Sequence, residues 1–581
     1  MIKQVVVVVM SFGLCVSAAR GDIAGSGDMT PPDPSTWTKS TDAYVGLRGG
    51  ATLDINNGGM LDSYDVHVGY FPGSTGVVTV DGSGSAWVNP NNFRVGWEGV
   101  GAVAITDGGS VTSGQSIIGG RAGSRGSVTI SGSGSNCTNA GLAYVGILGV
   151  GELSILDGGS MNSTETYIAS KDGSTGVVTV SGAGSTWTIA GVYPYIRVGE
   201  GGRGRLDISH GGSVSNVESS IGYYAGSDGT VTVSGADSKW AMGYLYVGYL
   251  GRGVLDISDG GMVEVRGRTR VEAGAGSSGG IIFDNGTLTT GGLRCPGTSL
   301  VGTGTINAHG LVSDVDLVFD ATHGLSQTLT LSGPGQDITV NLDVDGSASM
   351  GVGYSGKGSM LISDGVDIQS AYGYLGYQPG STGVVTIKGA GSTWTDPEAL
   401  YVGFEGSGTL EIIDGGVLST RNSQLGLYSG SMGVVTVSGI GSRWSSGGIE
   451  IGVAGDGTMN IINGGLVKTS RRLTIDGKGN GGSFVNMATG GKLALPRDCD
   501  DSLESFLQLV GGSGAIRYWD ASISDWADIT GALSGLDYTL AYRSEGALAG
   551  YTVLTVPEPA TLLVLAAGGL PLLLRRRRNR R

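Results

Sequence analysis

Two pairs of aspartates have the spacing that acid–base chemistry would need. Asp314 and Asp316 lie two positions apart, so both side chains project from one face of an extended strand. Asp343 and Asp345 repeat this arrangement. A glycan-cleaving enzyme built on a β-helix would gather carboxylates or a basic group on one such face. No histidine, lysine or arginine recurs beside these aspartates, so we predict that the protein is not an enzyme.

Recurrent Asp-Gly-Gly turns are a second place where carboxylates could act, because a ladder of acidic turns could bind calcium. The alternative is structural: Asp and Asn hydrogen-bond their own backbone, and glycine takes the left-handed conformation of a corner. One copy carries His210 in place of the acid, which favours the structural turn. We therefore predict no metal site and no cofactor. The turn residues are Asn57, Asp107, Asp157, His210, Asp259, Asp414 and Asn463.

A row of tryptophans recurs at equivalent places, and exposed rings of this kind could stack on sugars. The alternative is a buried aromatic ladder, which the internal stacks of a solenoid naturally produce. The neighbouring Ser and Gly residues supply few polar groups for sugar hydroxyls, so the buried ladder is the favoured interpretation. Glycan contact is the less favoured reading for Trp87, Trp187, Trp394 and Trp444, which share the row with Trp240. The same ambiguity applies to Tyr518, Trp519 and Trp526.

The elements that carry these residues belong to an internal repeat. A Val-Gly phrase recurs, and its adjacent copies lie 49 to 53 residues apart. Each unit divides into halves of about 23 and 27 residues, and each half holds a short strand between glycine turns. Such halves favour the coils of an all-β, right-handed parallel β-helix of some 20 coils. A β-propeller is less favoured, because each blade needs four strands in meander order. The glycines of the phrase are Gly46, Gly96, Gly146, Gly199, Gly248, Gly353, Gly403 and Gly452.

The N-terminus resembles a secretory signal. Lys3 precedes an apolar run from Val5 to Val16, and Val16 and Ala18 supply small residues for cleavage. The predicted organisation then follows the repeat along the chain. It comprises a signal peptide (1–18), a leader linker (19–40), β-helix repeats (41–263), degenerate coils (264–346), further repeats (347–467), a C-terminal β cap (468–555) and a tail (556–581).

The tail combines a short motif, an apolar helix and a basic cluster. Pro557, Glu558 and Pro559 lead into an apolar stretch over 560–574. Fifteen helical residues span only about 22 Å, less than the roughly 30 Å hydrocarbon core, so we expect a transient transmembrane helix. The alternative is an ordinary single-pass tail anchor. The basic cluster, expected to stay cytoplasmic, begins Arg575, Arg576, Arg577 and Arg578.

This three-part order resembles a PEP-CTERM protein-sorting signal, over Val556 to Arg581 only. The resemblance implies cleavage by an exosortase-type protease in the inner membrane. The repeats resemble those of type V secretion passengers and PEP-CTERM proteins, most clearly over 144–187 and 401–444. They imply an autotransporter-like passenger solenoid. A true autotransporter ends in a long translocator barrel, whereas this chain ends in one short predicted helix.

Charge and composition narrow the function further. The net charge is −15, and processing at both ends would leave a mature chain near −21. Such a surface repels nucleic acid and anionic lipid. We expect an exported, non-catalytic surface or extracellular protein with a structural or adhesive role, whose partners include extracellular polysaccharide or cell-envelope components. The alternative is a glycan-binding or glycan-degrading β-helix protein of the extracellular matrix. A groove around Glu264 to Gly346 would favour that alternative, and uniform repeat faces would favour the first.

Overall fold

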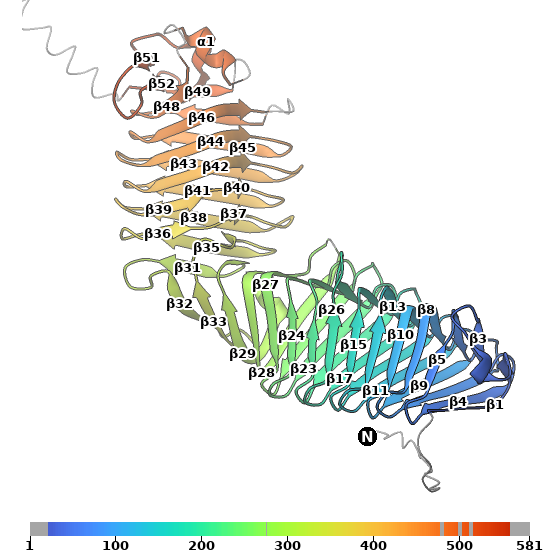
Figure 1. Ribbon diagram of the computed structural model, residues 1–581. Coiled ribbons are helices and arrows are strands. Elements are labelled where there is room, and N and C mark those ends of the chain that lie inside the picture. The colour runs from blue at the N-terminus through green and yellow to red at the C-terminus, as the bar shows by residue number, and fades with distance from the viewer. Residues whose placement is uncertain (1–20, 275, 477–481, 498–501, 511–514, 558–581) are drawn as a thin grey trace, which may run out of the picture. The chain divides into compact units, whose positions relative to one another are not determined.

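A computed structural model describes residues 21–274, 276–476, 482–497, 502–510 and 515–557. The strands wind into a parallel β-solenoid of about 18 turns (Figure 1). The chain divides into two units, one ending at Asn216 and the other beginning at Val217. The predicted all-β solenoid of stacked coils is therefore confirmed.

Each coil of the first unit contributes strands to three parallel sheets. In the first sheet, strands begin 25 residues apart from Gly50 to Thr175, so one coil corresponds to half of the sequence repeat. Alternate residues face inward: in β4, Ala51, Leu53 and Ile55 are buried. The strands of this sheet are β4 (Gly50–Asn56), β7 (Thr75–Asp81), β9 (Val100–Thr106), β11 (Arg125–Ser131), β14 (Val150–Leu156), β17 (Thr175–Ser181) and β20 (Arg203–Ser209).

The second and third sheets complete the coil, and two long strands, β8 and β10, belong to both. The second sheet holds β5 (Met60–Asp62), β8 (Ala86–Val95), β10 (Ser110–Ile118), β12 (Asn136–Asn139), β15 (Ser160–Ser163), β18 (Thr186–Ile189) and β21 (Ser213–Ser215). The third sheet holds β3 (Ala43–Val45), β6 (Val66–Val68), β13 (Leu142–Val145), β16 (Glu165–Ile168) and β19 (Tyr195–Val198) with the ends of β8 and β10.

The second unit repeats this plan with one interruption. Its first sheet begins with β23 (Asp228–Ser234), β26 (Arg252–Ser258), β28 (Ser278–Arg294) and β29 (Leu300–Ala308). A new sheet starts at β31 (Asp316–Phe319) and continues through β35 (Lys357–Ile362), β38 (Thr382–Lys388), β41 (Ser407–Ile413), β43 (Met432–Ser438), β45 (Asp456–Ile462), β47 (Phe484–Met487), β49 (Ile516–Asp520) and β50 (Asp525–Asp528). Figure 1 shows β35 to β46 stacked in order.

The second sheet of this unit is broken at the same place. It runs through β24 (Lys239–Met242), β27 (Met262–Val271), β28 and β29 to β33 (Gln336–Asp343), where β32 (Ser326–Leu331) adds antiparallel and closes the edge. It resumes with β36 (Asp367–Gln369), β39 (Thr393–Asp396), β42 (Val417–Leu425), β44 (Arg443–Ile451), β46 (Leu466–Ile475) and β48 (Lys492–Pro496). The segment predicted as degenerate coils, 264–346, thus contains ordinary coils followed by an inserted hairpin.

Only the third sheet passes the interruption without a break. Arg294 of β28 pairs with Val312, and Val312 pairs with Gly351 in the next strand. The stack then continues to the end of the repeats. Its strands are β22 (Glu218–Ile221), β25 (Tyr244–Val247), β30 (Leu311–Ser313), β34 (Met350–Val352), β37 (Tyr372–Leu375) and β40 (Ala399–Val402), together with the ends of β27, β28, β42, β44 and β46.

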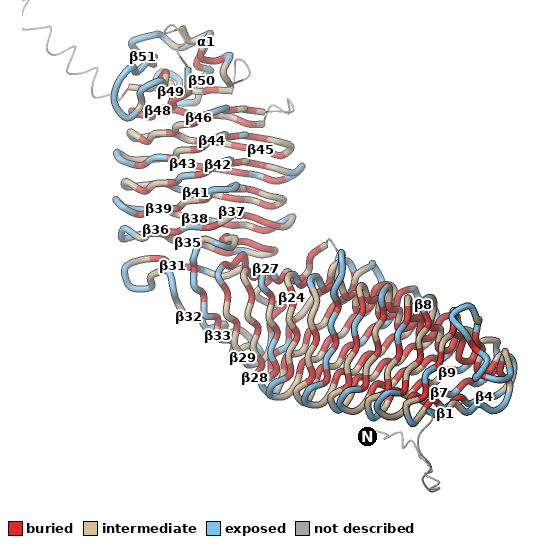
Figure 2. Tube along the Cα trace, viewed as in Figure 1, coloured by how far each residue is buried: buried red, intermediate tan, exposed pale blue. Residues whose placement is uncertain are grey.

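The core is a ladder of inward side chains in which five tryptophans lie between smaller residues of the neighbouring coils. In the first unit, Trp87 pairs in register with Leu61 and Val111. In the second unit, Trp394 pairs with Ile368 and Leu418. Figure 2 shows the buried positions running along the coils. All five tryptophans of the row are fully buried, so the predicted buried ladder is confirmed.

The corners explain the recurrent Asp-Gly-Gly phrase. All seven predicted turn residues have φ between 48° and 53°, a left-handed conformation that Asn and Asp tolerate and β-branched residues do not. In four of these turns the following glycine donates its N–H to a buried serine of the next coil, as Gly158 does to Ser185 at 3.0 Å. The left-handed conformation predicted for these corners is confirmed.

Antiparallel strands cover both ends of the solenoid. β1 (Asp22–Gly27) pairs with β4, and β2 (Met29–Thr30) pairs with β3. These strands lie in the segment predicted as a leader linker (19–40). The linker prediction was wrong for residues 21–40. These strands pair through their main chain, and such pairing needs no alternating apolar pattern from which it could be predicted. A one-turn helix, η1 (Pro34–Thr36), then places Trp37 6.4 Å from Trp87.

At the other end, β52 (Tyr551–Thr555) pairs antiparallel with β48 and with β51 (Thr539–Arg543). A short helix, α1 (Leu503–Gln508), precedes this cap. Among the described residues, no helix is long and apolar enough to span a membrane. The predicted signal (1–18), Glu558, Pro559, the apolar stretch 560–574 and the arginine cluster lie outside the described residues, and Pro557 is the last residue inside them.

Candidate functional site

The aspartates singled out for acid–base chemistry are engaged in structural hydrogen bonds. Asp314 Oδ1 accepts from the backbone N–H groups of Ser355 at 3.0 Å and Gly356 at 2.8 Å. Asp316 accepts from the backbone N–H of Ser359 at 3.1 Å. Both carboxylates therefore join one coil to the next, and in this arrangement they act as anchors for the turn that follows the inserted hairpin.

The second pair is bound in the same way. Asp343 accepts a hydrogen bond from the hydroxyl of Ser326. Asp345 accepts from Ser347 N at 2.8 Å and lies 3.2 Å from His309 Nδ1. Burial opposes ionisation of Asp345, but the hydrogen bonds from Ser347 and the nearby His309 prevail and lower the pKa of this carboxyl. A lowered pKa is the opposite of what a general acid needs.

The tryptophans proposed as glycan contacts are inaccessible, and that less favoured reading was wrong. Trp87, Trp187, Trp394 and Trp444 are each 0% exposed. Their indole N–H groups donate to hydroxyls of the preceding coil, for example Trp187 Nε1 to Ser163 Oγ at 3.2 Å. Burying the whole ring and pairing its single donor leaves nothing for a sugar to contact. Cys137, which replaces tryptophan in one coil, is also buried.

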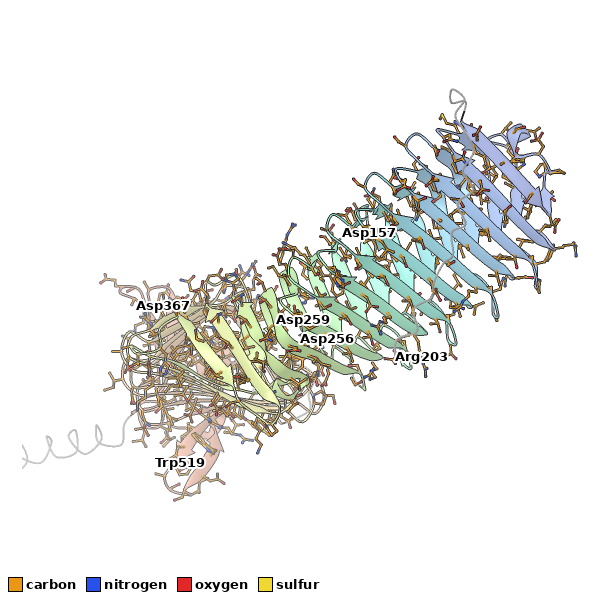
Figure 3. The ribbon with its side chains drawn as sticks, turned by 90° about the horizontal axis from the view of Figure 1, so that it is seen from below. Asp157, Arg203, Asp256, Asp259, Asp367 and Trp519 are labelled. Atoms are coloured by element: carbon orange, nitrogen blue, oxygen red, sulfur yellow. The ribbon has the colours of Figure 1, made fainter. Side chains whose placement is uncertain are left out.

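The C-terminal tryptophans differ from the ladder. Trp519 and Trp526 face each other across the hairpin of β49 and β50, with ring centroids 5.4 Å apart in an edge-to-face arrangement. Trp519 is 43% exposed and lies on this terminal hairpin (Figure 3). The pair is therefore partly accessible to solvent, unlike the tryptophans of the coils.

The acidic turns do not converge. Asp157, labelled in Figure 3, follows β14 at a coil corner, and its left-handed φ of 52° accounts for its presence. No group of three or more histidine, cysteine, aspartate or glutamate side chains that could hold a metal ion occurs within the described part of the chain.

Two hollows are lined largely by residues of the segment 264–346. The larger, about 630 Å³, lies beside the inserted hairpin and is lined by Asp314, Asp316, His323, Gln327 and Gln336 among others. Its aspartates make the coil-joining bonds given above, and His323 Nδ1 lies 2.8 Å from Asp320. The ionisable groups that line this hollow are therefore already paired with protein groups.

The second hollow is lined by arginine and tyrosine. It has a volume of about 340 Å³ and lies on the outer surface of the third sheet of the second unit. We call it the arginine–tyrosine groove, defined by Tyr244, Arg266, Arg268, Arg294, Ser349 and Tyr372. Its rims are accessible, since Tyr244 is 42% and Tyr372 is 36% exposed.

Tyrosines hold the arginines of this region in place. Arg294 Nη2 donates to Ser349 Oγ at 2.7 Å, and its guanidinium lies 4.6 Å from the ring centroid of Tyr374. Arg268 Nη2 donates to Tyr246 Oη at 3.2 Å. Arg270 lies deeper, with Nε 3.3 Å from Tyr354 Oη. Stacked, hydrogen-bonded guanidinium groups keep their charge and a fixed orientation.

The tyrosines below this groove form a compact cluster. Tyr354 and Tyr377 stack with centroids 5.1 Å apart, and Tyr374 and Tyr401 stack at 5.2 Å. Burial raises the pKa of Tyr354 to about 12, against the opposing effect of Arg270, so its hydroxyl stays neutral at physiological pH. The cluster gives the groove a rigid aromatic base.

A third hollow continues along the same sheet. It also measures about 340 Å³ and is lined by Ala399, Tyr401, Gln424, Glu450, Arg471 and Arg472 among others. We call it the distal groove. Ala399 pairs in register with Tyr372 of the arginine–tyrosine groove, so the two hollows adjoin.

A buried carboxyl lies near the same strands. Asp396 ends β39 and is fully buried, and the backbone N–H groups near its carboxyl oxygens do not reach full hydrogen-bond geometry. Burial raises its pKa to about 9, although the backbone N–H groups of Gly373, Glu398 and Ala399 pull in the opposite direction. Asp396 occupies the place that Asn89 and Asn139 hold in other coils, two residues beyond the ladder position. It is a neutral core residue at physiological pH.

Sequence reasoning missed the arginine–tyrosine groove. The phrase Arg266-Gly-Arg-Thr-Arg270 was the available signal, because no other repeat carries three arginines at this point. The chain matches no protein-family model, no curated protein and no solved structure in the comparisons.

Proposed function

We propose that the protein is an exported, non-catalytic, right-handed solenoid of the bacterial surface or extracellular matrix, with a structural or adhesive role. The observation that carries this proposal is that the side chains best suited to chemistry make structural contacts within the fold. Asp314 and Asp316 join coils, Asp343 and Asp345 bind nearby serines, and the tryptophan row fills the core. What remains outside is a long series of similar coils, which suits a spacer or scaffold.

The proposed route to the surface rests on the two ends. The N-terminal signal directs export, and the tail resembling PEP-CTERM signals holds the chain in the inner membrane until an exosortase-type protease cleaves at Pro557 to Pro559. The antiparallel cap formed by β48, β51 and β52 ends at Thr555. Cleavage just beyond it would leave the solenoid closed at that end, which supports the proposed order of cap and tail.

The test is the state of the C-terminus in the native host. Cells are fractionated, and the terminal peptide is identified by mass spectrometry. We expect a chain outside the inner membrane that ends near Pro557, and a variant with Pro557→Ala and Pro559→Ala that retains its arginine tail in the membrane. A matched control, Pro496→Ala at the end of β48, should be processed normally. An intact tail in the inner-membrane fraction of wild-type cells would contradict the proposal.

A second candidate function is glycan binding without catalysis. The specific observation in its favour is the arginine–tyrosine groove, which lies beside the segment 264–346 where the repeat changes character. A structural solenoid with one recognition groove would combine both roles.

A further inference from the structure

The arginines of the arginine–tyrosine groove have no acidic partners. Arg266, Arg268 and Arg294 form no ion pair with any carboxylate of the described residues, although the chain as a whole is strongly acidic. The carboxylate nearest in sequence to Ser347 of the groove, Asp345, is bound by that serine and by His309. Three uncompensated cations on adjacent coils create a local positive field.

Equivalent arginines of the first unit show the contrast. Arg94 and Arg197 occupy the same outward position of the third sheet as Arg294. Arg94 pairs with Asp65 at 3.2 Å, and Arg197 pairs with Glu200 at 2.9 Å. The hydrogen-bond partners of Arg294 are instead the neutral hydroxyls of Ser349 and Tyr377. Neutral partners fix the orientation of the guanidinium without cancelling its charge, so the Arg294 side chain is placed to bind an external anion.

The floor of the groove consists of glycine backbone. Gly267, Gly291 and Gly292 line it between the arginines. A Cβ at Gly291 would stand 2.5 Å from the carbonyl oxygen of Gly267, and one at Gly267 would stand 2.7 Å from the Tyr244 ring. Glycine therefore allows both close coil stacking and a shallow floor on which a ligand can lie flat.

The groove is elongated along the stack. Register pairs connect Tyr246 to Thr474 in nine steps, which at about 4.8 Å each cover on the order of 40 Å. Arginines lie at both ends, with Arg471 and Arg472 in the distal groove. Between them Tyr401 and Gln424 supply an aromatic ring and an amide. Glu450 also lines the distal groove and accepts from Gln424 Nε2 at 2.6 Å.

We propose that this continuous groove binds one chain of an acidic polysaccharide, whose carboxylates pair with Arg266, Arg268 and Arg294 at one end and with Arg471 and Arg472 at the other. Guanidinium groups bind carboxylates through two parallel hydrogen bonds. Exposed tyrosine rings offer apolar faces to the sugar rings, and amides and hydroxyls meet their hydroxyl groups. The inference rests on the second candidate function and names its substrate class.

Charge density favours this ligand over nucleic acid. Duplex DNA carries one charge per about 1.7 Å, and its binding needs a broad basic surface. Here the arginines without a carboxylate partner that line the groove are few, whereas Arg94, Arg197 and Arg252 elsewhere are paired with acids, and the net charge of −15 would repel a dense polyanion beyond the groove. A uronate polymer carries one charge per sugar and presents ring faces between charges.

The test measures binding of the full chain to polygalacturonate by isothermal titration calorimetry. We expect binding that weakens as salt rises and falls at least tenfold in the double variant Arg266→Gln with Arg268→Gln, whose exposed side chains are not needed for folding. Arg294→Lys keeps the charge but loses the planar fork, and should weaken binding several-fold. The matched control is Arg252→Gln, an exposed arginine paired with Asp228 at 2.8 Å, which should leave binding unchanged.

Several outcomes would overturn the inference. These are an absence of binding to polygalacturonate, equal affinity for neutral dextran, tighter binding to a single-stranded oligonucleotide or to phosphatidylglycerol vesicles, or a double variant that binds like wild type while retaining its far-ultraviolet circular dichroism spectrum. Each of these leaves C-terminal processing and surface location untouched. Failure of the glycan site is therefore distinguishable from failure of the proposed export and scaffold role.

Discussion

The indole Nε1 of Trp394 donates a hydrogen bond of 2.9 Å to Ser370 Oγ, 24 residues earlier and one coil away. The same relation joins Trp187 to Ser163 and Trp444 to Thr420. The core enclosed by each coil is narrow, so it depends on such large side chains for its apolar volume. The hydrogen bond makes their burial possible, because an indole N–H without a partner inside the solenoid would be costly.

Truncating Trp394 should destabilise its coil locally. We expect Trp394→Ala to lower the free energy of local opening by about 3–5 kcal/mol, through the cavity left in the ladder. Trp394→Phe should cost less, since it keeps most of the volume but leaves Ser370 Oγ without its donor. Hydrogen exchange of the β36, β39 and β42 amides measures both. Ile440→Ala, at a site 85% exposed, is the control and should leave exchange unchanged; equal effects of Ala at both sites would refute the ladder's role.

The left-handed backbone at the coil corners should restrict which residues are tolerated there. Asp157 has a φ of 52°, so Asp157→Val places a β-branched side chain in a conformation that costs about 1–2 kcal/mol. Asp157→Asn should be neutral, because Asn57 and Asn463 occupy the equivalent corners. Thermal unfolding of both variants with and without added calcium provides the measurement. A loss of stability in Asp157→Asn that appears only with calcium present would instead show that the carboxylate binds the ion.

Asp396 should make stability depend on pH. Its pKa rises from 3.8 to about 9 on folding, so the neutral form is favoured by the fold. The stabilisation is complete below pH 4 and is lost as pH rises from about 4 towards 9, because the unfolded chain releases a proton that the folded chain retains. Asp396→Asn removes this loss. We expect the variant to be more stable than wild type by on the order of 5 kcal/mol at pH 8, and to match it at pH 4.

The measurement for Asp396 is hydrogen exchange of β39 and β42, corrected for the intrinsic effect of pH. The control is Asp367→Asn, which makes the same substitution at an exposed carboxylate at the start of β36. A constant difference between Asp396→Asn and wild type at both pH values would show that the carboxyl is not neutral in the folded chain.

The buried cysteines should be inert. Burial raises the pKa of both Cys137 and Cys295 to about 12, and the thiolate is the reactive form. In the native protein, iodoacetamide at pH 8 should leave both unmodified, whereas both should react after denaturation. Peptide mass spectrometry gives the extent at each site. Native labelling of Cys137 at the rate of the denatured chain would mean that its coil opens readily.

The stacked coils were predictable because every coil pairs with its neighbour at a nearly constant interval. Inward residues such as Leu53 and Val78 recur with that interval, and the corner glycines mark each turn. The burial of Trp87 and the conformation of Asp107 follow from the same local pattern. These features can be predicted because each coil repeats the sequence pattern of the coil before it.

The arginine–tyrosine groove was not predictable in this way. Arg268 and Tyr372 are about a hundred residues apart, and they line one hollow because an inserted hairpin interrupts two sheets while the third continues. The N-terminal cap was missed for another reason: Asp22 to Gly27 pairs through backbone alone and has no alternating apolar pattern. Whether Asp396 is buried likewise depends on its surroundings in three dimensions.

The alternation of the core ladder limits how such a chain can change length. Trp394 and Trp444 each lie between aliphatic residues of the coils on either side. Copying a single coil at this place in the gene would set two indoles against each other, or two aliphatic side chains beside each other. Copying a pair of coils preserves every contact. Around these tryptophans, gene duplication therefore preserves the packing when it copies a pair of coils, and the length of the solenoid changes there in those increments.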